Sequence, residues 1–458
     1  MHRFDAIVIG TGQAGPSMAA RLAAKGMRVA VIERARFGGT CVNTGCIPTK
    51  ALVASAYVAH KAREASHYGV EIDAPVRVDM KKVKARKDDI SGQSRDAVEA
   101  WMRSLEHCVV YQGHARFTGP RTVSVNGETL HGERIFINVG ARPLVPDMPG
   151  VRDVPFLTSD SMMDVDFAPK HLLIVGGSYI GLEFGQMYRR FGSEVTIVEK
   201  APRLIGREDP DVSDTVADIL QGEGIALRLS ATCLSLEPDP QGAAIQVECA
   251  EGAPRAAGSH VLLAVGRAPN TDDLGLDAAG IRTDKRGYIE VADDLETSVP
   301  GVYALGDCNG RGAFTHTAYN DYEIVAANLL DGAQRRVTDR ITSYALFIDP
   351  PLGRIGMTDA EAREAVDRVL VGKRPMTRVG RAVQKGEPQG FMKITVDADS
   401  RRILGAAIFG VAGDEVVHSL IDVLYARMPY EAVQRAVRIH PTVSELIPTT
   451  LEDLQPLG

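Results

Sequence analysis

Residues 4–15 read Phe-Asp-Ala-Ile-Val-Ile-Gly-Thr-Gly-Gln-Ala-Gly, an apolar strand that runs into a glycine-rich turn. A helical pattern follows, and a second apolar strand then ends at Glu33. In such a unit Gly10 permits the tight turn, Gly12 lets the backbone approach a pyrophosphate, and Gly15 lets the helix pack closely on the strand. The helix N-terminus favours the pyrophosphate anion, and the Glu33 carboxylate can accept hydrogen bonds from ribose hydroxyls. The stretch therefore predicts a dinucleotide-binding βαβ unit.

A second unit of the same kind begins at residue 172. Residues 172–181 read Leu-Leu-Ile-Val-Gly-Gly-Ser-Tyr-Ile-Gly, and a helix to about Phe191 and a strand ending at Glu199 follow. Ser178 stands where the second glycine is expected, and its side chain is small enough to be tolerated. Two complete units predict two bound dinucleotides and an α/β fold with two Rossmann-like domains. The residues of this unit that we expect at the cofactor are Gly176, Ser178, Tyr179, Ile180, Gly181 and Glu199.

Length and composition set wider limits on the function. The chain has 458 residues, which is enough for two to four domains. Its formal net charge of −7 argues against nucleic acid or an anionic membrane as the main partner. We find no apolar stretch of the roughly 18 residues that a membrane span needs, and the N-terminus enters a strand without a signal peptide. We expect a cytoplasmic protein, and we expect the basic run at 81–87 to form a solvated helix face.

The predicted domains are interleaved along the chain. We expect an FAD-binding domain in two parts (1–150 and 271–337), an NAD(P)-binding domain (151–270) and a C-terminal domain (338–458). In the second FAD-binding part, Gly306 ends a strand, and the Asp307 carboxylate suits the ribityl hydroxyls of a flavin; a turn or helix cap is the alternative. Gly140 and Gly266 are assigned to the cofactor sites as well. A hairpin (390–397 and 403–409) and helices near 414–426 and 430–437 predict an α+β domain at the C-terminus.

The six cysteines contain one pair that is close in sequence. They stand at positions 41, 46, 108, 233, 249 and 308. A turn or a distorted helix start can bring Cys41 and Cys46 within disulfide distance, and a helix N-terminus lowers the pKa of a cysteine thiol. Lys50 lies one helical turn beyond Cys46 and favours a thiolate there. The alternatives are a metal site or two buried thiols, although no other cysteine pair completes a zinc site.

These motifs together carry a family resemblance over essentially the whole chain. The most specific are Gly39-Thr40-Cys41-Val42-Asn43-Thr44-Gly45-Cys46, Gly306-Asp307 and His440-Pro441-Thr442-Val443-Ser444-Glu445. The chain resembles the class I pyridine nucleotide-disulfide oxidoreductases, which include dihydrolipoamide dehydrogenase, glutathione reductase and mercuric reductase. It is most similar to the mercuric-reductase-like branch and to the flavoprotein of reactive-chlorine resistance, and the run Pro350-Pro351-Leu352-Gly353-Arg354-Ile355-Gly356-Met357-Thr358 supports that placement.

The resemblance implies roles for the matching residues. NAD(P)H reduces FAD, and FAD reduces the Cys41–Cys46 disulfide. Cys46 forms the charge-transfer thiolate, and Cys41 is the interchange thiol that attacks the acceptor. The resemblance further implies that Gly39 and Thr40 contact FAD, that Lys50 pairs with Glu183 near the flavin, and that the pair of His440 and Glu445 moves protons. For Glu183 an exposed helix position is the alternative, and for His440 a structural role. The C-terminal domain is implied to form a homodimer.

The acceptor and the nicotinamide cofactor stay open at this point. Glu199 favours NADH because a carboxylate repels a 2′-phosphate, whereas Arg203 and Arg207 could bind one, and we expect NADPH to be accepted. Cys308 is the last cysteine, so the C-terminal tail offers no thiol pair to relay a metal, and no Cys-x-x-Cys carrier precedes residue 41. The best interpretation is a reductase of a small-molecule or protein disulfide or another thiol-reactive acceptor. The alternatives are a mercuric or other metal-ion reductase, a dihydrolipoamide dehydrogenase, a flavoprotein oxidase or transhydrogenase, and a nucleotide-dependent redox sensor.

Overall fold

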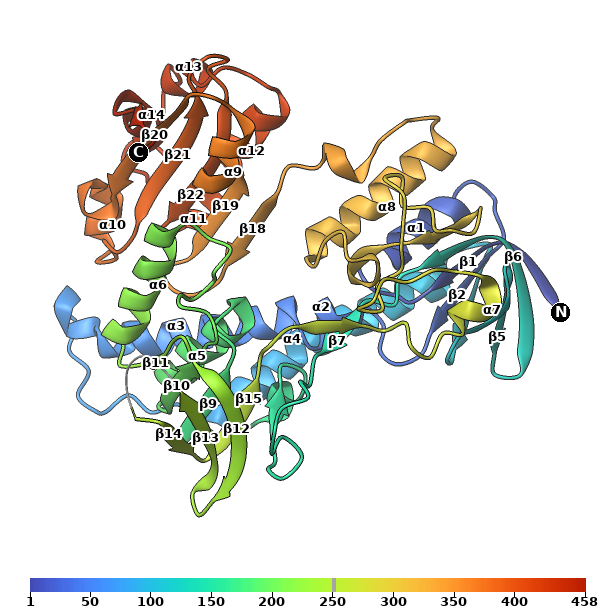
Figure 1. Ribbon diagram of the computed structural model, residues 1–458, viewed down its shortest axis with the longest axis horizontal. Helices are drawn as coiled ribbons and strands as arrows, with labels where there is room; N and C mark the ends of the chain where they lie inside the picture. The colour runs from blue at the N-terminus through green and yellow to red at the C-terminus, as the bar shows by residue number, and fades with distance from the viewer. Residues whose placement is uncertain (249–252) are drawn as a thin grey trace.

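The computed structural model of the chain describes residues 1–248 and 253–458, and Cys249 lies outside them. Three sheet-based parts surround a common centre (Figure 1). Two are parallel sheets of the Rossmann type, and the third is the C-terminal antiparallel sheet. The fold class predicted from the sequence is therefore confirmed. Across the described ranges, no helix combines the length and apolarity that crossing a membrane requires.

The first sheet has the order β3-β2-β1-β6-β5-β4, and β17 pairs with β6. The neighbours β3, β2, β1, β6 and β17 are parallel, whereas β4 and β5 extend the sheet in antiparallel fashion. The bounds are β1 (His2–Ile9), β2 (Val29–Glu33), β3 (Cys108–Gln112), β4 (Arg116–Gly119), β5 (Thr122–Val125), β6 (Glu128–Ile137) and β17 (Val302–Ala304). Because β17 comes from a later part of the chain, two separate segments build this sheet. Helices α1 (Gly15–Ala23) and α8 (Thr315–Leu330) pack together beside it.

The second sheet has the order β11-β10-β9-β15-β8, with all neighbouring strands parallel. Its strands are β8 (Leu157–Thr158), β9 (His171–Val175), β10 (Glu194–Val198), β11 (Ala226–Arg228) and β15 (His260–Leu263). Helices α5 (Tyr179–Phe191) and α6 (Pro210–Gly222) belong to the same part. Three further strands form a separate antiparallel sheet in this part: β12 (Thr232–Asp239), β13 (Gly242–Glu248) and β14 (Arg255–Gly258). The antiparallel pair β7 (Ala141–Pro143) and β16 (Arg267–Pro269) connects the two Rossmann-type parts.

The C-terminal sheet has the order β18-β19-β22-β21-β20-β23. Its strands are β18 (Ser343–Leu346), β19 (Leu352–Gly356), β20 (Val369–Pro375), β21 (Phe391–Asp397), β22 (Ile403–Phe409) and β23 (Gln455–Pro456). The predicted hairpin is confirmed as β21 and β22. The predicted helix over 414–426 is wrong in detail, because it divides at Val417 into α11 (Gly413–Val416) and α12 (His418–Tyr425), and α13 is shorter than expected (Glu431–Gln434).

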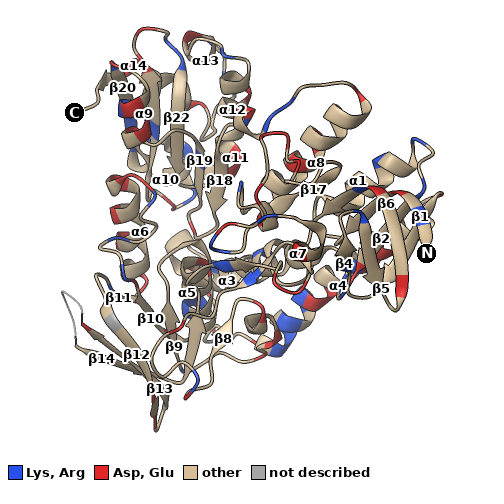
Figure 2. Cartoon of the chain, turned by 45° about the vertical axis from the view of Figure 1, so that its right-hand side comes forward, with Lys and Arg blue, Asp and Glu red and all other residues tan. Residues whose placement is uncertain are grey.

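The remaining helices complete the chain. They are α2 (Gly39–Asn43), α3 (Cys46–Arg63), α4 (Met80–Ser104), α7 (Leu276–Ala279), α9 (Asp359–Ala365), α10 (Gly380–Gln384), α14 (Leu446–Glu452) and the short 3-10 turns η1 (Ala65–Tyr68), η2 (Ser161–Asp164), η3 (Gly306–Asn309), η4 (Val337–Asp339) and η5 (Met376–Arg378). The basic run lies on α4, which is marked by blue segments in Figure 2. The predicted solvated face is wrong at Lys87, which is buried and donates a hydrogen bond to the Met163 carbonyl oxygen at 2.7 Å.

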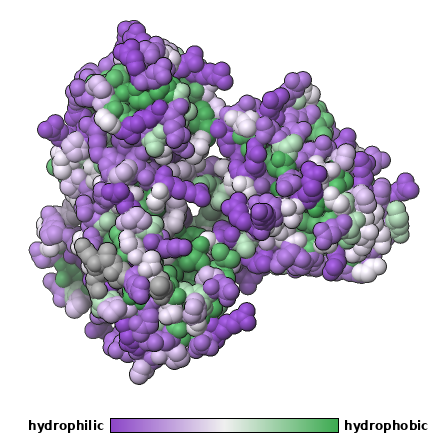
Figure 3. Space-filling model, viewed as in Figure 1, coloured by the Kyte–Doolittle hydropathy of each residue, from purple (hydrophilic) through white to green (hydrophobic). Residues whose placement is uncertain are grey.

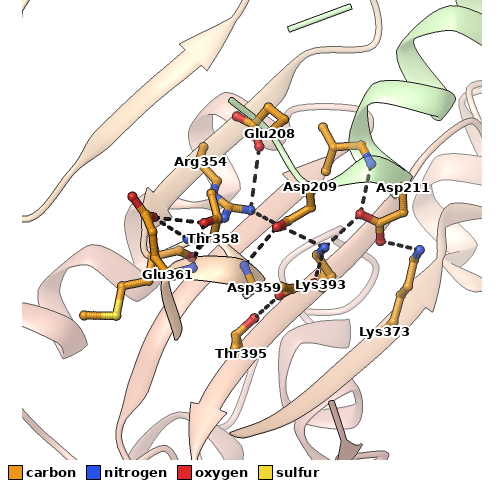
Figure 4. A network of polar contacts seen from close by, with 12 residues as sticks. Glu208, Asp209, Asp211, Arg354, Thr358, Asp359, Glu361, Lys373, Lys393 and Thr395 are labelled. Atoms are coloured by element: carbon orange, nitrogen blue, oxygen red, sulfur yellow. Dashed lines mark hydrogen bonds and ion pairs between the residues drawn. The ribbon is translucent and has the colours of Figure 1, made fainter. Parts of the chain in front are cut away.

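A buried ion network holds the C-terminal sheet to the start of α6 (Figure 4). Arg354 Nη1 lies 3.0 Å from Asp209 Oδ2, and Lys393 Nζ lies 2.9 Å from the same oxygen. Lys393 also contacts Asp211 and Asp359, each at 2.8 Å. Removing one partner would leave an uncompensated buried charge, which is costly. The network therefore fixes the C-terminal sheet against the second Rossmann-type part.

Candidate active site

A cavity of about 1790 Å³ lies where the three parts meet. Both glycine turns line it, together with Cys41 on α2 and Cys46 at the start of α3. The space-filling view shows the surface hollowed in this central region (Figure 3). The volume is well above the roughly 300–1,000 Å³ of a pocket for one drug-sized ligand, so the cavity has room for more than one extended ligand.

The first glycine turn leaves no space for side chains. Gly10 has φ +98°, and a Cβ atom there would lie 2.3 Å from the Asn138 carbonyl oxygen. A Cβ atom on Gly15 would lie 2.2 Å from the Gly10 oxygen, and one on Gly12 would lie 3.0 Å from Asn138 Oδ1. The Gly15 amide donates to Asn138 Oδ1 at 2.9 Å, and Asn138 Nδ2 donates to the Leu305 oxygen at 3.0 Å. Asn138, which follows β6, was not found from the sequence because no motif surrounds it.

The Glu33 and Glu199 carboxylates end equivalent strands and make equivalent contacts. Glu33 Oε2 accepts from the Thr11 amide at 2.9 Å, and Oε1 accepts from the Ala35 amide at 2.8 Å. Glu199 Oε2 accepts from the Gly177 amide at 2.6 Å, and Oε1 accepts from the Ala201 amide at 2.7 Å. Each carboxylate thus ties its glycine turn to the strand end and still faces the cavity that a ribose would enter.

The second glycine turn repeats the geometry of the first. Gly176 has φ +115°, and a Cβ atom on Gly181 would lie 2.1 Å from the Gly176 oxygen. Ser178 precedes α5 in extended conformation, and Tyr179 and Ile180 open the helix on the cavity wall. The Tyr179 ring lies edge-on to the rings of Phe314 and Tyr344, with centroids 6.3 and 5.6 Å away. Tyr179 therefore lies between the second glycine turn and the start of α8.

The two cysteine thiols lie side by side on the cavity wall. Cys41 is on α2, and α3 begins at Cys46 rather than at Ala51 as the sequence suggested. A hydrogen bond from the Cys41 thiol, supported by contacts with Thr315 and Lys50, lowers the pKa of Cys46 to about 6. The same hydrogen bond raises the pKa of Cys41. These contacts favour the negative charge of the pair on Cys46, with Cys41 as its hydrogen-bond donor.

Thr315 is a second site residue that the sequence reasoning missed. It is the first residue of α8, and its Oγ1 lies 3.1 Å from Cys46 Sγ. The 16-residue helix α8 and the 18-residue helix α3 therefore both direct their N-termini at the same sulfur. Free N–H groups and helix dipoles at these termini favour an anion. No sequence signal links positions 46 and 315, which are 269 residues apart.

Lys50 and Glu183 are brought together across two domains. Lys50 Nζ lies 2.7 Å from Glu183 Oε2, and the other carboxylate oxygen accepts from the Phe347 amide at 3.0 Å. Lys50 Nζ also lies 4.3 Å from the centroid of the Phe347 ring. The Glu183 side chain is only 7% exposed, so the alternative of an exposed helix position is wrong.

The remaining predicted cofactor residues line one side of the cavity. Asp307 Oδ2 lies 3.4 Å from Arg267 Nε, and burial raises the pKa of Asp307 despite that cation. Arg267 also reaches Thr40 Oγ1 at 3.4 Å. A Cβ atom on Gly39 would lie 2.9 Å from the Gly12 Cα, so α2 crosses close to the first glycine turn. The other glycines of this group have positive φ angles, namely Gly140 (+64°), Gly266 (+131°) and Gly306 (+76°).

Comparison with known proteins decides the family. The sequence profile of the pyridine nucleotide-disulphide oxidoreductases matches residues 4–321, and that of their dimerisation domain matches residues 342–451. The chain belongs to the pyridine nucleotide-disulfide oxidoreductase family. It is 35% identical to RclA of Escherichia coli over 97% of this chain and 98% of the relative. It is 33% identical to a dihydrolipoyl dehydrogenase of Thermus scotoductus, with 97% and 96% covered.

Other relatives set the wider context. A mercuric reductase of Staphylococcus aureus is 31% identical over 91% of this chain and 76% of the relative. Among solved structures, the HOCl-induced flavoprotein disulfide reductase RclA from Escherichia coli superposes with a TM-score of 0.88 at 34% identity, covering 97% and 98% of the two chains. Its Cu(II) complex gives a TM-score of 0.89 at 33% identity, with 99% of both chains covered. Members of the family use FAD and NAD(P)H, and the sequence resemblance to the RclA type is confirmed.

In this oxidoreductase His440 and Glu445 pair with each other but lie apart from the thiols. His440 Nδ1 lies 2.9 Å from Glu445 Oε2, and the His440 side chain is 81% exposed. Both residues fall within the region that matches the dimerisation domain. Neither His440 nor Glu445 is among the residues that line the cavity. Within a single chain the His440 imidazole is therefore exposed to solvent, away from the cavity that Cys41 lines.

Among the described residues, neither Cys41 nor Cys46 belongs to a set of metal ligands. In the part of the chain that the structure describes, no group of three or more His, Cys, Asp or Glu side chains is arranged to hold a metal ion. Cys108 and Cys308 stand apart as free thiols, and burial raises the pKa of each. Among these cysteines, Cys46 combines a lowered pKa with a place on the cavity wall, where a thiolate can react with a ligand.

Proposed function

We propose that this chain uses NAD(P)H to reduce the Cys41–Cys46 disulfide through bound FAD, and then passes the electrons to a disulfide or another thiol-reactive acceptor. In the first half, NAD(P)H and one proton give NAD(P)⁺ and the dithiol. In the second half, the dithiol reduces an acceptor R–S–S–R to two thiols, and the Cys41–Cys46 disulfide forms again. We further propose domain boundaries near residues 150, 270 and 337. The second sheet begins with β8 and ends with β15, β17 then returns to the first sheet, and the C-terminal sheet begins with β18.

One observation carries the proposal: two adjacent thiols, one with a pKa near 6, line the cavity that both glycine turns also line. The first turn fits a dinucleotide, because a Cβ atom on Gly10 or Gly15 would collide with backbone oxygens. Only glycines there allow the tight turn and the close helix packing that present a helix N-terminus to a pyrophosphate. Asp307 is buried beside Arg267, where its carboxylate can meet the hydroxyls of a ribityl chain. When bound there, FAD supplies hydride and electron transfer between the nicotinamide and the disulfide.

The side chains around Cys46 stabilise its negative charge during the thiol–disulfide exchange. We propose that Cys46 stays the thiolate because Cys41, Thr315, Lys50 and two helix N-termini all favour its anion. Cys41, which keeps its proton longer, is the thiol that attacks the acceptor once it is deprotonated. The cation of Lys50 is held near Cys46 by Glu183.

The proton for Cys41 is assigned to His440 of a second subunit. A proton donor must lie within about 3 Å of the sulfur or act through one water, yet His440 faces outward in its own chain. Next to it, Val437 is 100% exposed and Ile439 is 80% exposed. Apolar side chains exposed in this way, on a dimerisation domain, support a twofold homodimer in which each subunit completes the other's site.

The nicotinamide cofactor is proposed to bind at the second glycine turn. Glu199 places a carboxylate at the position for the ribose, which favours NADH over NADPH. Arg203, which could offset that charge, lies 3.0 Å from Asp214 and is engaged there. Arg207 lines the cavity and leaves a route by which NADPH is accepted at lower efficiency.

An anaerobic titration tests the function. The purified protein should bind FAD, and either nicotinamide should reduce it and produce a long-wavelength charge-transfer band from the Cys46 thiolate. A panel of disulfides should then reoxidise the enzyme. Cys41→Ser should retain FAD and the thiolate band of Cys46 but lose disulfide turnover, whereas Cys46→Ser should lose the band. Retention of full disulfide turnover by Cys41→Ser would refute the proposal.

Copper is the second candidate acceptor, and one observation favours it. The similar Escherichia coli structure was solved as a Cu(II) complex. Two Cu(II) ions could each accept one electron from the dithiol, which would give two Cu(I) ions, the Cys41–Cys46 disulfide and two protons. Thiolates suit Cu(I) as the product. Reoxidation of the NADH-reduced enzyme by Cu(II), with Cu(I) trapped by a chelator, would distinguish this acceptor from disulfides.

A further inference from the structure

Helix α5 carries three buried polar residues along one side. Glu183, Gln186 and Arg190 stand at spacings of three and four, which places them on one face of the helix. All three are buried, with whole-residue exposures of 6%, 4% and 5%. Burying polar groups costs free energy unless they are hydrogen-bonded. We therefore expect each of these side chains to have hydrogen-bond partners. Helix α5 also lies beside α3, which carries Lys50.

Gln186 and Arg190 bind the loop between β18 and β19 by hydrogen bonds to Asp349. Gln186 Nε2 donates to the Asp349 carbonyl oxygen, and Gln186 Oε1 accepts from the Asp349 amide, both at 2.8 Å. Arg190 Nη1 donates to Asp349 Oδ2 at 2.7 Å. We call these contacts of Gln186 and Arg190 with Asp349 the Asp349 clamp. Glu223 supports the clamp, since its carboxylate accepts hydrogen bonds from both Gln186 and Arg190 at 2.8 Å. Asp349 is thus held by its backbone and its side chain together.

The loop that contains Asp349 also contacts the active site, through Phe347 two residues before it. The Phe347 amide donates to Glu183 Oε1, and the Phe347 ring lies under the ammonium group of Lys50. Glu183 uses its other oxygen for Lys50. Phe347 therefore touches both members of the ion pair, and its own position depends on how Asp349 is held.

We propose that Gln186 and Arg190 are positioning residues that act on Cys46 through Asp349, Phe347 and Lys50. The inference rests on the proposed role of Lys50 beside the thiolate. If the clamp opens, the Phe347 amide leaves Glu183, and the carboxylate and the ammonium group are free to shift together. The attraction between Lys50 and the Cys46 thiolate then weakens. Because Gln186 is neutral, its replacement changes the position of charges near Cys46 without changing their number.

The test compares Gln186→Leu with Lys50→Met in the FAD-bound enzyme. Leucine is similar in size to glutamine but makes neither hydrogen bond to Asp349. The readout is the pH at which the charge-transfer band of the reduced enzyme is half formed, which follows ionisation of Cys46. An opposite charge nearby typically lowers a pKa by about one to three units. We expect Lys50→Met to raise the midpoint by about one unit or more, and Gln186→Leu to raise it by about half of that.

A double variant and a matched control separate the clamp from general destabilisation. In Gln186→Leu/Lys50→Met the shift should equal that of Lys50→Met alone, because the clamp acts through the lysine. Gln246→Leu makes the same exchange on β13, where the glutamine donates to Glu237 at 2.9 Å, and should leave the midpoint unchanged. If Gln186→Leu does not fold, Arg190→Lys carries the test, since it keeps the charge but loses the two-point contact with Glu223.

The possible results distinguish failure of the Asp349 clamp from failure of the proposed role of Lys50. A Gln186→Leu protein that melts earlier but titrates like the wild type would overturn the clamp and leave the role of Lys50 intact. Additive shifts in the double variant would overturn it as well. If Lys50→Met itself leaves the midpoint unchanged, the proposed role of Lys50 fails and the inference fails with it.

Discussion

The contact between Thr315 and Cys46 gives the sharpest prediction about the thiol chemistry. Its Oγ1 lies 3.1 Å from Cys46 Sγ, a short distance for a hydrogen bond to sulfur. When Cys46 is a thiolate the hydroxyl must be the donor. Thr315→Val removes that donor while it keeps the branched shape of the side chain. The start of α8, and with it the helix dipole aimed at the sulfur, should stay in place.

The expected magnitude follows from the charge on the sulfur. A hydrogen bond to a charged group typically contributes about 1.5–3 kcal/mol, and one pKa unit corresponds to about 1.36 kcal/mol. Loss of the bond should therefore raise the pKa of Cys46 by about one to two units. From the value of about 6, the midpoint should move to between about 7 and 8. The sign is fixed, since the hydroxyl stabilises the ionised form of Cys46 more strongly than the neutral thiol.

The assay is a pH titration of the charge-transfer band in the two-electron-reduced enzyme, with alkylation of Cys46 by iodoacetamide as a second measure. At pH 7 most Cys46 should be ionised in the wild type and half or less in Thr315→Val. Thr315→Ser is the matched control, because it keeps the hydroxyl and loses only a methyl group. It should titrate within about 0.3 units of the wild type. Coincident titration curves for the valine and wild-type enzymes would refute the reasoning.

Three further predictions concern the cofactor, the acceptor and the assembly. Glu199→Gln should lower KM for NADPH about tenfold relative to NADH, because two unit charges about 4 Å apart repel by about 1–4 kcal/mol near a protein surface; Glu33→Gln, its counterpart at the first turn, should leave that ratio unchanged. Mercuric ion should be turned over poorly beside a good disulfide, because residues 309–458 contain no cysteine that could relay a soft cation to Cys41. Mixing inactive Cys41→Ser and His440→Ala subunits should restore activity in about a quarter of the sites, since half of the dimers are mixed and each has one intact site; heterodimers without activity would show that each site is built within one chain.

Much of the fold could be predicted from the sequence because its signals are local. Each glycine turn is a continuous run whose spacing states the backbone conformation, and Gly10 and Gly176 both adopt the positive φ that the pattern requires. The hairpin of β21 and β22 was likewise visible as two apolar runs around a short turn. By contrast, the division of the helix at Val417 depends on how α11 packs on β19, and no local residue marks it.

The site was less completely predicted because its last contacts cross the chain. Cys41, Cys46 and Lys50 lie within one short segment, and a helical repeat relates the last two. Thr315 reaches Cys46 from 269 residues away, and Asn138 reaches Gly15 from 123 residues away. Lys87 illustrates the opposite error, since a run of cations on a helix suggests solvent even when one member turns inward to a carbonyl oxygen.

The C-terminal domain is attached to the second Rossmann-type part of its own chain by buried ion pairs and hydrogen bonds. Arg354 and Lys393 fix it to α6 through Asp209, and the Asp349 clamp fixes it to α5 beside Lys50. The same domain presents His440 outward, beside fully exposed Val437. One rigid element would therefore set the cation near Cys46 in one subunit and the acid–base group near Cys41 in the other. Removal of the His440 imidazole should disturb the partner's proton transfer and spare its own subunit's thiolate, whereas a shift of the whole domain should disturb both.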